Sequence, residues 1–518
     1  MICVHARQSE LEKMGASALS SLVIAQMIRI EHLELQVARL NRSQFGQKSE
    51  KAPINADQLT LSLNGSVIEA QPALSLQVEQ PPAGQENSVK PARAPRKNRA
   101  LPVHLRREIK THLPEHTKCP CCNGELRKLG EDTSEMLEYM PASFYVIRHV
   151  RPKMSCRKCS CVVQAAAPER VIDRGLPGPG LLAHVATAKF ADHQPLYRQS
   201  QIFAREGIEL DRSVLARRIG ETAALLAPVA EVLRRYVLDT EKLHGDDTPL
   251  PVLAPGTGKT KTGRFWTYVR DNRAAGDKAA PAVWFAYSPN RRGEHPQAHL
   301  AKFEGILQAD AFAGFNKLYE DGAIQEAPCM AHIRRKFFDL MKAHNSPIAT
   351  EAVQRIAALY LIEREIKGRS AEQRRAVRTA RAKPLFDDMR RWLEEVLYQV
   401  VQKSETAAAI RYALSLWDAL ARYLDDGRIE LDTLIAERAL RCVAIGRRNY
   451  LFAGSDAGGR RAAILYSLIQ TARMNGLDPE AYLRYVLARI GEHPIKRIEE
   501  LLPGNVAGKL APALRQAA

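Results

Sequence analysis

Two aspartates that close strand-like runs are the first candidates for chemistry in this 518-residue sequence. Asp246 ends the run that begins at Leu243, and Asp310 ends the run that begins at Gly305. If these runs are neighbouring strands, their carboxylates meet at one edge of a sheet. Carboxylates gathered in this way bind Mg²⁺, which takes oxygen ligands and shares them with substrate phosphates. Successive strand side chains face opposite ways, so only one of Asp246 and Asp247 can point into such a site.

Four cysteines form a second candidate metal site. They occur as two C-x-x-C pairs, Cys119 with Cys122 and Cys156 with Cys159. Four thiolates complete the tetrahedral shell of a structural Zn²⁺ ion, and this spacing favours zinc over a disulfide framework. Cys121 and Cys161 lie close enough in the sequence to compete as ligands. No βαβ pattern surrounds either pair, which argues against a redox function.

The sheet that positions the aspartates is expected from short apolar or alternating runs with turn residues between them. The runs cover residues 243–246, 264–270, 282–287 and 305–310, with a fifth at 327–331 that leads into a helix. Three consecutive strands followed by alternating helices and strands predict an α/β fold with a mixed sheet covered by helices. Residues 346–425 are expected to form a helical insertion in this core, because this stretch carries no strand signal.

A basic turn joins the first two of these strands. Residues 256–260 look like the end of a phosphate loop, but Leu253 stands where that motif requires its first glycine. A phosphate loop must also open a helix, so that its amide groups face the phosphates. We therefore expect Lys259 and Lys261 at a basic hairpin tip, where they can contact DNA phosphates.

Residues 196–219 read as a helix, a glycine-containing turn and a second helix that begins after Asp211. Arg212, Arg217 and Arg218 on the second helix suit a helix-turn-helix placed in a DNA major groove. Two ordinary packed helices joined by a turn would have the same pattern. Both interpretations remain open at this point.

A heptad pattern covers residues 16–40 near the amino terminus. Val23, Ile30 and Val37 occupy one core position, and Leu19, Leu33 and Leu40 occupy the other. β-Branched residues at the first position with Leu at the second favour a two-stranded parallel coiled coil. A helix packed on its own chain is an equally good interpretation. Residues 52–85 lose this period and predict a linker, which ends in a basic run.

Charge and hydropathy restrict the class of partner. The chain has 76 basic and 58 acidic residues and a formal net charge of +18. Such an excess favours a polyanionic partner, and nucleic acid is the first candidate. No apolar run approaches the roughly 20 residues that span a bilayer, and no signal peptide is recognisable. We therefore expect a soluble, intracellular protein without a membrane partner.

Further motifs occur in order along nearly the whole chain, at residues 44–50, 192–198, 246–249, 259–264, 308–310, 331–337, 436–438 and 446–456. Together with the paired cysteines, they resemble the large subunit of transposases of the bacterial insertion-sequence family sixty-six. The resemblance implies a DDE recombinase with an RNase H-like core. It also implies that Asp246, Asp310 and Glu437 form the acidic triad. The position of Glu437 in the sequence alone would not make it a better candidate for the third acid than Glu430.

The resemblance implies two Mg²⁺ ions, for which Mn²⁺ can substitute, and a two-metal displacement at phosphorus. Double-stranded DNA would be the partner, as transposon ends and as target, and the reaction would be nicking followed by strand transfer. Arg447 and Arg448 would contact phosphates near the active edge. The resemblance also implies that the protein forms a homodimer or higher oligomer and works with accessory transposition proteins. It further implies a location in the bacterial cytoplasm, associated with the nucleoid. The sequence departs from the family at Thr433, Leu434 and Cys442.

The expected domain organisation has eight parts. They are an N-terminal coiled-coil-like helix (1–50), a flexible basic linker (51–110), a zinc-binding domain (111–172), a helical segment (173–238), the first part of the catalytic core (239–345), a helical insertion (346–426), the last part of the core with Glu437 (427–475) and a helical tail (476–518). Two other functions remain open: a catalytically inactive zinc-dependent DNA-binding protein, and an RNase H-like nuclease without strand transfer.

Overall fold

A computed structural model describes residues 16–45 and 101–510, apart from Pro102, His104, 115–117, 119–120, 141–142, Glu169, 173–174 and Pro255. In the first of these ranges, side chains are described for Ser21 and residues 23–37. The expected linker thus lies mostly outside the described residues. The chain divides into two compact units, and the larger one, Met1–Gln36 with Leu101–Ala518, contains both sheets.

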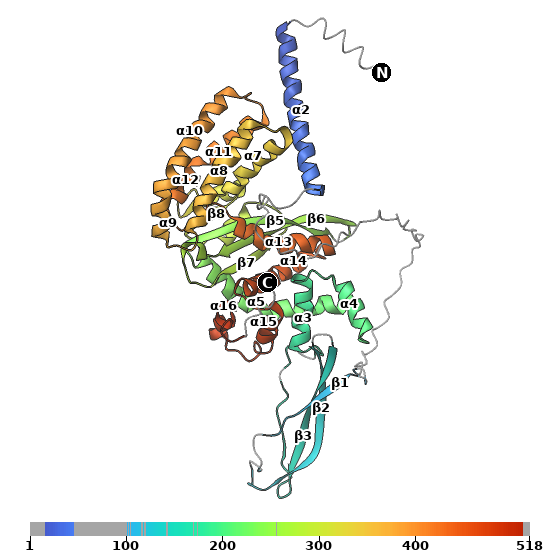
Figure 1. Cartoon of the computed structure of the whole chain (residues 1–518). Coiled ribbons are helices and arrows are strands. Elements are labelled where there is room, and N and C mark those ends of the chain that lie inside the picture. Colours follow the sequence, from blue (N-terminus) through green and yellow to red (C-terminus); the bar gives the residue numbers. More distant parts are fainter. Residues whose placement is uncertain are drawn as a thin grey trace, which may run out of the picture. The chain divides into compact units, whose positions relative to one another are not determined.

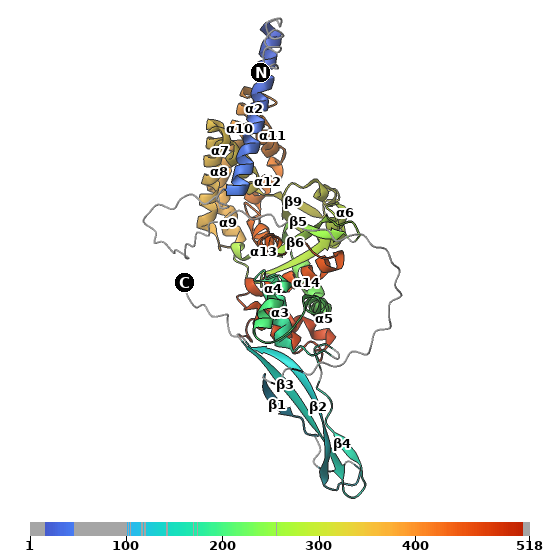
Figure 2. The same ribbon diagram turned by 90° about the vertical axis from the view of Figure 1, so that its right-hand side faces the viewer.

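The first sheet is built on a long antiparallel hairpin of β2 (Leu126–Met140) and β3 (Ser143–Cys156). β1 (Arg106–Thr111) pairs with β3 in parallel, and β4 (Val162–Gln164) pairs with β3 in antiparallel orientation (Figure 2). The sequence alternates between polar and apolar residues over 138–150, which is typical of a hairpin. The hairpin extends beyond these residues and brings residues next to the cysteine pairs together at one end, where Leu126 lies opposite Cys156.

Three helices follow: α3 (Pro179–Phe190), α4 (Leu196–Arg205) and α5 (Arg212–Leu238). The helix, turn and helix after residue 196 are confirmed, but the prediction that the second helix ends at Ile219 is wrong. α5 continues to Leu238 because its buried stripe runs on through Ala223, Leu226 and Val229. Gly220 is a close-contact position in this helix, since a Cβ there would lie 3.0 Å from the guanidinium of Arg461.

The second sheet has the order β7-β6-β5-β8-β9. β5 (Lys242–Ala254), β6 (Lys259–Arg270) and β7 (Ala282–Ser288) are antiparallel, whereas β8 (Gly305–Ala309) and β9 (Ile324–Pro328) are parallel to β5 (Figure 1). The mixed sheet is thus confirmed, and its fifth strand begins three residues earlier than predicted. The prediction that the first strand ends at Asp246 is wrong, because β5 continues to Ala254 in its antiparallel pairing with β6. The β5–β6 turn contains Gly256 and Gly258, both at positive φ (79° and 65°), so the basic hairpin tip is also confirmed.

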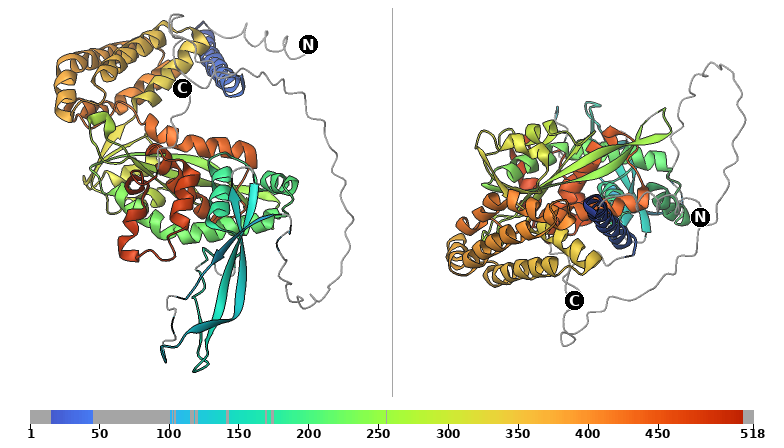
Figure 3. Two further views of the ribbon diagram at one scale, coloured as in Figure 1. Left: turned by 60° about the horizontal axis from the view of Figure 1, so that its bottom comes forward. Right: turned by 90° about the horizontal axis from the view of Figure 1, so that it is seen from above.

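Helices cover this sheet. α5 and α14 (Asp456–Met474) pack against β7, and α13 (Leu434–Tyr450) packs against β5 and β6 (Figure 3). One apolar core joins the sheet to these helices and to α15 (Pro479–Leu487). Helices that precede the sheet in the sequence and helices that follow it therefore both pack against the strands.

A second apolar core lies within the helices that follow β9. They are α7 (Met330–His344), α8 (Pro347–Ile366), α9 (Ala371–Val377), α10 (Lys383–Gln399), α11 (Glu405–Ser415) and α12 (Trp417–Asp425). Residues 347–425 form no strand, in agreement with the predicted helical character. The chain then returns to the sheet through residues 426–433 and enters α13.

The amino-terminal helix α2 (Ala16–Phe45) has two apolar faces. Leu35 is 1% exposed and joins the core of the helices around α7, and His32 lies 2.6 Å from Glu405 on α11. By contrast, Val23, Ile30 and Val37 remain 51%, 53% and 55% exposed. The helix thus packs on its own chain through one face and leaves the predicted heptad face uncovered in the single chain.

None of the helices in the described ranges combines the length and apolar character that a bilayer crossing requires.

Candidate active site and zinc site

The parallel pairing of β5 with β8 positions the two aspartates. His244 lies opposite Gln308 in this register, and Asp246 and Asp310 follow two residues later on each side. Glu437 lies in the first turn of α13, the helix that packs against β5. The three acids, although distant in sequence, are thus carried by three elements that meet at one edge of the sheet.

The electrostatics show that these carboxylates are neighbours. Burial raises the pKa of Asp246 well above its usual range, and the charges of Asp310 and Glu437 raise it further. Burial also raises the pKa of Asp310. Like charges in a poorly solvated place disfavour ionisation, and a cation among them would reverse this effect.

The carboxylate of Glu437 is held by two basic side chains of α7. His332 Nε2 lies 3.6 Å from its Oε1, and Arg335 Nη2 lies 3.5 Å from its Oε2. Within the described part of the chain, the three acids do not form a group whose ligand atoms all lie within 4.8 Å of one another. Mutual repulsion and the pull of His332 and Arg335 explain this open arrangement.

Buried polar atoms without hydrogen-bond partners gather at this edge. Among the described residues, Asp310 Oδ1, Glu437 Oε1 and His332 Nδ1 are buried and accept or donate no hydrogen bond. Such orphaned atoms are costly unless a ligand or ion completes them. These two unsatisfied carboxylate oxygens, in a place where burial raises the pKa values of Asp246 and Asp310, fit the ligand chemistry of Mg²⁺.

Asp247 has a different environment from Asp246. Its fully buried carboxylate accepts hydrogen bonds from Arg264 Nη1 at 2.8 Å and from Arg291 Nη2 at 2.8 Å. Two guanidinium groups already neutralise this carboxylate. Asp246, which has no ion pair among the described residues, is thus the better candidate for a cation ligand.

A buried polar network fixes the segment that leads into α13. Gln308 donates to the backbone carbonyls of Glu430 and Asp432 and accepts from the amide of Glu430. The Glu430 carboxylate lies 3.3 Å from Lys242 Nζ and 3.2 Å from His244 Nε2, both fully buried on β5. The same strands that carry Asp246 and Asp310 therefore determine where the Glu437 helix begins.

The three departures from the family pattern are accommodated in this region. Thr433 is fully buried, and its hydroxyl donates to the carbonyl of Gln308 at 3.2 Å. Cys442 is buried in α13, and its thiol donates to the carbonyl of Ala439. Leu434 is partly exposed at the start of the helix.

The basic residues proposed for DNA differ in their surroundings. The exposed ones are Arg212, Arg217, Lys259, Lys261 and Arg448. Lys261 pairs with Asp456 at 2.7 Å, and Arg218 pairs with Glu221 at 2.8 Å. Arg447 donates to the Thr248 hydroxyl and to the Pro249 carbonyl, so it connects α13 to β5.

Sequence reasoning missed Arg291, Arg335 and the Lys242–Glu430 pair. Arg291 belongs to none of the motifs, and Glu430 could not be distinguished from Glu437. Arg291 is 44 positions from Asp247, and Lys242 is 188 positions from Glu430. No local periodicity carries a signal for contacts of that range.

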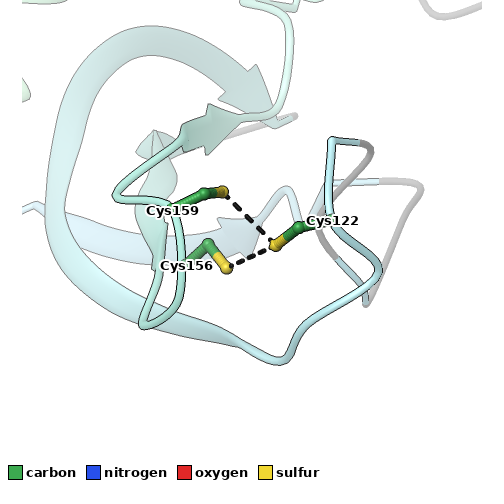
Figure 4. A group of neighbouring side chains, drawn as sticks. All are labelled: Cys122, Cys156 and Cys159. Atoms are coloured by element: carbon green, nitrogen blue, oxygen red, sulfur yellow. Dashed lines mark hydrogen bonds between the residues drawn. The ribbon is translucent and has the colours of Figure 1, made fainter.

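Three thiols form a compact cluster at the end of the β2–β3 hairpin. Cys122 Sγ lies 3.3 Å from Cys156 Sγ and 3.4 Å from Cys159 Sγ (Figure 4). Hydrogen bonds from the backbone of Cys159 and Lys158 hold the pKa of the Cys156 thiol below its usual range, which favours the thiolate that metals bind. The cluster is the one group of three metal-binding side chains within 4.8 Å among the described residues.

Two further described cysteines of this region, Cys121 and Cys161, do not belong to the cluster. Cys121 Sγ lies 3.8 Å from Cys161 Sγ. Cys119, the predicted fourth ligand, lies outside the described residues. The three clustered thiols fit a structural Zn²⁺ site that lacks one described ligand.

Comparison with known families agrees with this combination of a zinc site and an α/β core. Residues 174–461 match the family described as "Transposase IS66 family", and residues 116–160 match the "zinc-finger binding domain of transposase IS66". Residues 467–503 match the "IS66 C-terminal element", and residues 32–109 match "Transposase C of IS166 homeodomain". The chain belongs to the IS66 transposase family.

Relatives in Sinorhizobium fredii (strain NBRC 101917 / NGR234) are similar over almost the full length. Uncharacterized protein y4hP is 44% identical over 494 residues, which is 91% of this chain and 88% of the relative. Uncharacterized protein y4qI is 39% identical over 485 residues, covering 92% of this chain and 89% of the relative. The resemblance inferred from the motifs is thus confirmed at the level of the family.

Proposed function

We propose that this protein is a DDE transposase that nicks DNA at the ends of its insertion sequence and joins the freed ends to target DNA. Asp246, Asp310 and Glu437 are its proposed catalytic acids. The observation that carries the proposal is the meeting of these three carboxylates at one sheet edge, where burial and their mutual charges raise the pKa of Asp246. The order of the second sheet, with three antiparallel strands followed by two parallel to β5, supports an RNase H-like core.

Asp246 and Asp310 would hold Mg²⁺, or Mn²⁺ in its place, with Glu437 completing the ligand set. When bound, two such ions activate the attacking oxygen and stabilise the leaving oxygen of an in-line displacement at phosphorus. The buried Glu430 network fixes the start of α13 and thereby the position of Glu437. Arg335 and His332 hold the Glu437 carboxylate beside the other acids.

The remaining modules would bind and align DNA. Cys119, Cys122, Cys156 and Cys159 are the proposed ligands of a structural Zn²⁺ that fixes the end of the hairpin. The exposed basic residues on α5, at the β5–β6 tip and on α13 would contact phosphates, with the net charge of +18 favouring association. The uncovered heptad face of α2 supports a homodimer, and accessory transposition proteins remain part of the proposal.

Cleavage of an end-containing duplex tests this function. We expect the purified chain to nick DNA that carries its own terminal sequences when Mg²⁺ is present, and to transfer the nicked strand to a target plasmid. Asp246→Asn should abolish both steps, whereas Glu320→Gln, which changes an exposed acid, should retain them. Binding without cleavage would identify an inactive DNA-binding relative, and cleavage without transfer would identify a nuclease.

A further inference from the structure

A guanidinium that no motif singled out lies beside the acidic edge. Arg291, in the loop between β7 and α6 (Glu294–His299), donates from Nε to Asp247 Oδ1 at 3.0 Å and from Nη2 to the same oxygen at 2.8 Å. Its Nη2 also lies 3.8 Å from Asp310 Oδ2. The side chain thus bridges the carboxylate next to Asp246 and the second acid of the proposed triad.

Arg291 is held in place from two sides. The Asp247 carboxylate is fully buried and is itself fixed by Arg264. The guanidinium carbon of Arg291 lies 4.0 Å from the ring centroid of Phe312, which packs edge-on against Phe315. A long, flexible side chain loses much entropy when it is ordered, and here the protein has already ordered it before any substrate arrives.

The Arg291 guanidinium still has a donor group available for a ligand. It is 39% exposed, and no described residue accepts a hydrogen bond from its Nη1. A planar guanidinium suits bidentate contact with a phosphate group. A DNA phosphate that approaches three carboxylates meets strong repulsion, and a fixed cation 3.8 Å from Asp310 opposes it.

We propose that Arg291 contacts the scissile phosphate of the DNA and aligns it with the acidic edge. Asp247 and Phe312 are positioning residues that hold the guanidinium. This inference rests on the proposed function, because it assigns the substrate group that the same site takes. It differs from a purely structural role, in which Arg291 serves only to neutralise the buried Asp247.

Arg291→Ala is the first variant, and Arg292→Ala, which removes the same charge from the adjacent exposed residue, is its matched control. In single-turnover nicking with saturating DNA and Mg²⁺, we expect Arg291→Ala to lose about 100-fold in rate, as when one charge-stabilising donor is removed from an active site. Arg291→Lys should recover only part of the rate, because lysine lacks the planar fork. Arg292→Ala should stay within about twofold of wild type. Wild-type rates for Arg291→Ala would overturn the proposal.

A double variant separates phosphate contact from neutralisation of Asp247. If Arg291 only offsets that buried charge, Arg291→Ala combined with Asp247→Asn should restore the rate and the thermal midpoint. If Arg291 contacts the phosphate, the double variant should recover the thermal midpoint but stay slow in nicking. Recovery of both would overturn the proposal.

A binding measurement keeps this inference distinct from the proposed function. With Ca²⁺ in place of Mg²⁺, a neutral methylphosphonate at the scissile position should weaken binding of the wild-type chain about tenfold, the value of one charge-assisted hydrogen bond. The same change should weaken binding of Arg291→Ala by a smaller factor, because only the bound ions would then contact that phosphate. Absence of nicking by the wild-type chain would refute the proposed function, whereas equal methylphosphonate effects on both proteins would refute the role of Arg291.

Discussion

Asp246 shows the energetic consequence of bringing the acids together. Its pKa is raised by burial and by Asp310, so its ionised form is disfavoured in the folded state. The folded pKa of Asp246 lies above its unfolded pKa of about 4. Ionisation of this carboxylate therefore destabilises the folded state increasingly as the pH rises from the unfolded pKa to the folded pKa. At neutral pH the acids therefore repel one another, and a bound divalent cation would relieve this repulsion.

We expect Asp246→Asn to raise the midpoint of thermal unfolding of the metal-free protein at neutral pH, with a difference that shrinks as the pH falls toward about 4. Mg²⁺ at about 100 times its Kd should stabilise the wild-type chain by about 2.7 kcal/mol and should stabilise the variant much less. Scanning calorimetry with and without Mg²⁺ measures both effects. Equal stabilisation of wild type and variant by Mg²⁺ would argue against Asp246 as a ligand.

The thiol cluster makes a second prediction for single residues. The chain should carry about one Zn²⁺, and Cys156→Ser should lose it because this thiol lies within the cluster. Cys121→Ser should keep the ion, since Cys121 lies beside Cys161 instead. Metal analysis of the purified proteins distinguishes the two variants. Loss of zinc in Cys121→Ser with retention in Cys156→Ser would reverse the ligand assignment.

At the scale of elements, the segment before α13 determines the geometry of the site. Burial raises the pKa of Glu430, but His244 and Lys242 lower it more, so the carboxylate stays ionised against a buried lysine. Because this pKa is depressed, the stabilisation is present above the unfolded pKa of about 4.3 and is lost as the pH falls. α13 and its Glu437 thus depend on a buried ion pair on β5.

Glu430→Gln should lower the free energy of unfolding by about 3 kcal/mol at neutral pH, because it leaves Lys242 buried without a counter-charge. The same substitution at Glu394, which forms an exposed pair with Arg390, should cost at most about 0.5 kcal/mol. Denaturant titration compares the two variants. Nicking should also slow in Glu430→Gln, because Glu437 shifts with the start of α13. Equal stability losses in both variants would contradict this account.

The two faces of α2 predict how copies associate. Ile30 lies on the uncovered heptad face, so Ile30→Lys should abolish a coiled-coil dimer by burying a charge at its core. Ala25→Lys, at an exposed position off this seam, should leave the dimer intact. Sedimentation analysis reports the mass of each protein. An unchanged mass for Ile30→Lys would show that this face does not mediate self-association.

At the scale of the whole molecule, sequence patterns could predict the strands and that Asp310 follows one of them. The prediction that Asp246 ends its strand is wrong, because β5 continues past it to Ala254 by pairing with β6. The family resemblance supplied Glu437, which nothing local separates from Glu430. The sequence predicts separate helices over residues 211–219 and about 221–238, and it did not predict that they form one continuous helix, α5. A glycine in a helix looks like a stop when its partner, Arg461, is unseen.

The contacts that sequence could not predict are between charges far apart in the chain. Arg291 with Asp247, and Lys242 with Glu430, become visible only when strands and loops are assembled. Arg291 lies beside Asp310, and the Lys242–Glu430 pair fixes the segment that leads to Glu437. The long-range polar contacts, more than the apolar pattern, therefore distinguish a positioned site from a chance gathering of carboxylates.

The location of a bound divalent cation is the most direct measurement of the central claim. In crystals soaked with Mn²⁺, anomalous diffraction should place an ion about 2.1–2.2 Å from carboxylate oxygens of both Asp246 and Asp310, with Glu437 turned toward the same place. An ion bound elsewhere, or no ion at these acids at Mn²⁺ concentrations that support DNA cleavage, would contradict the account.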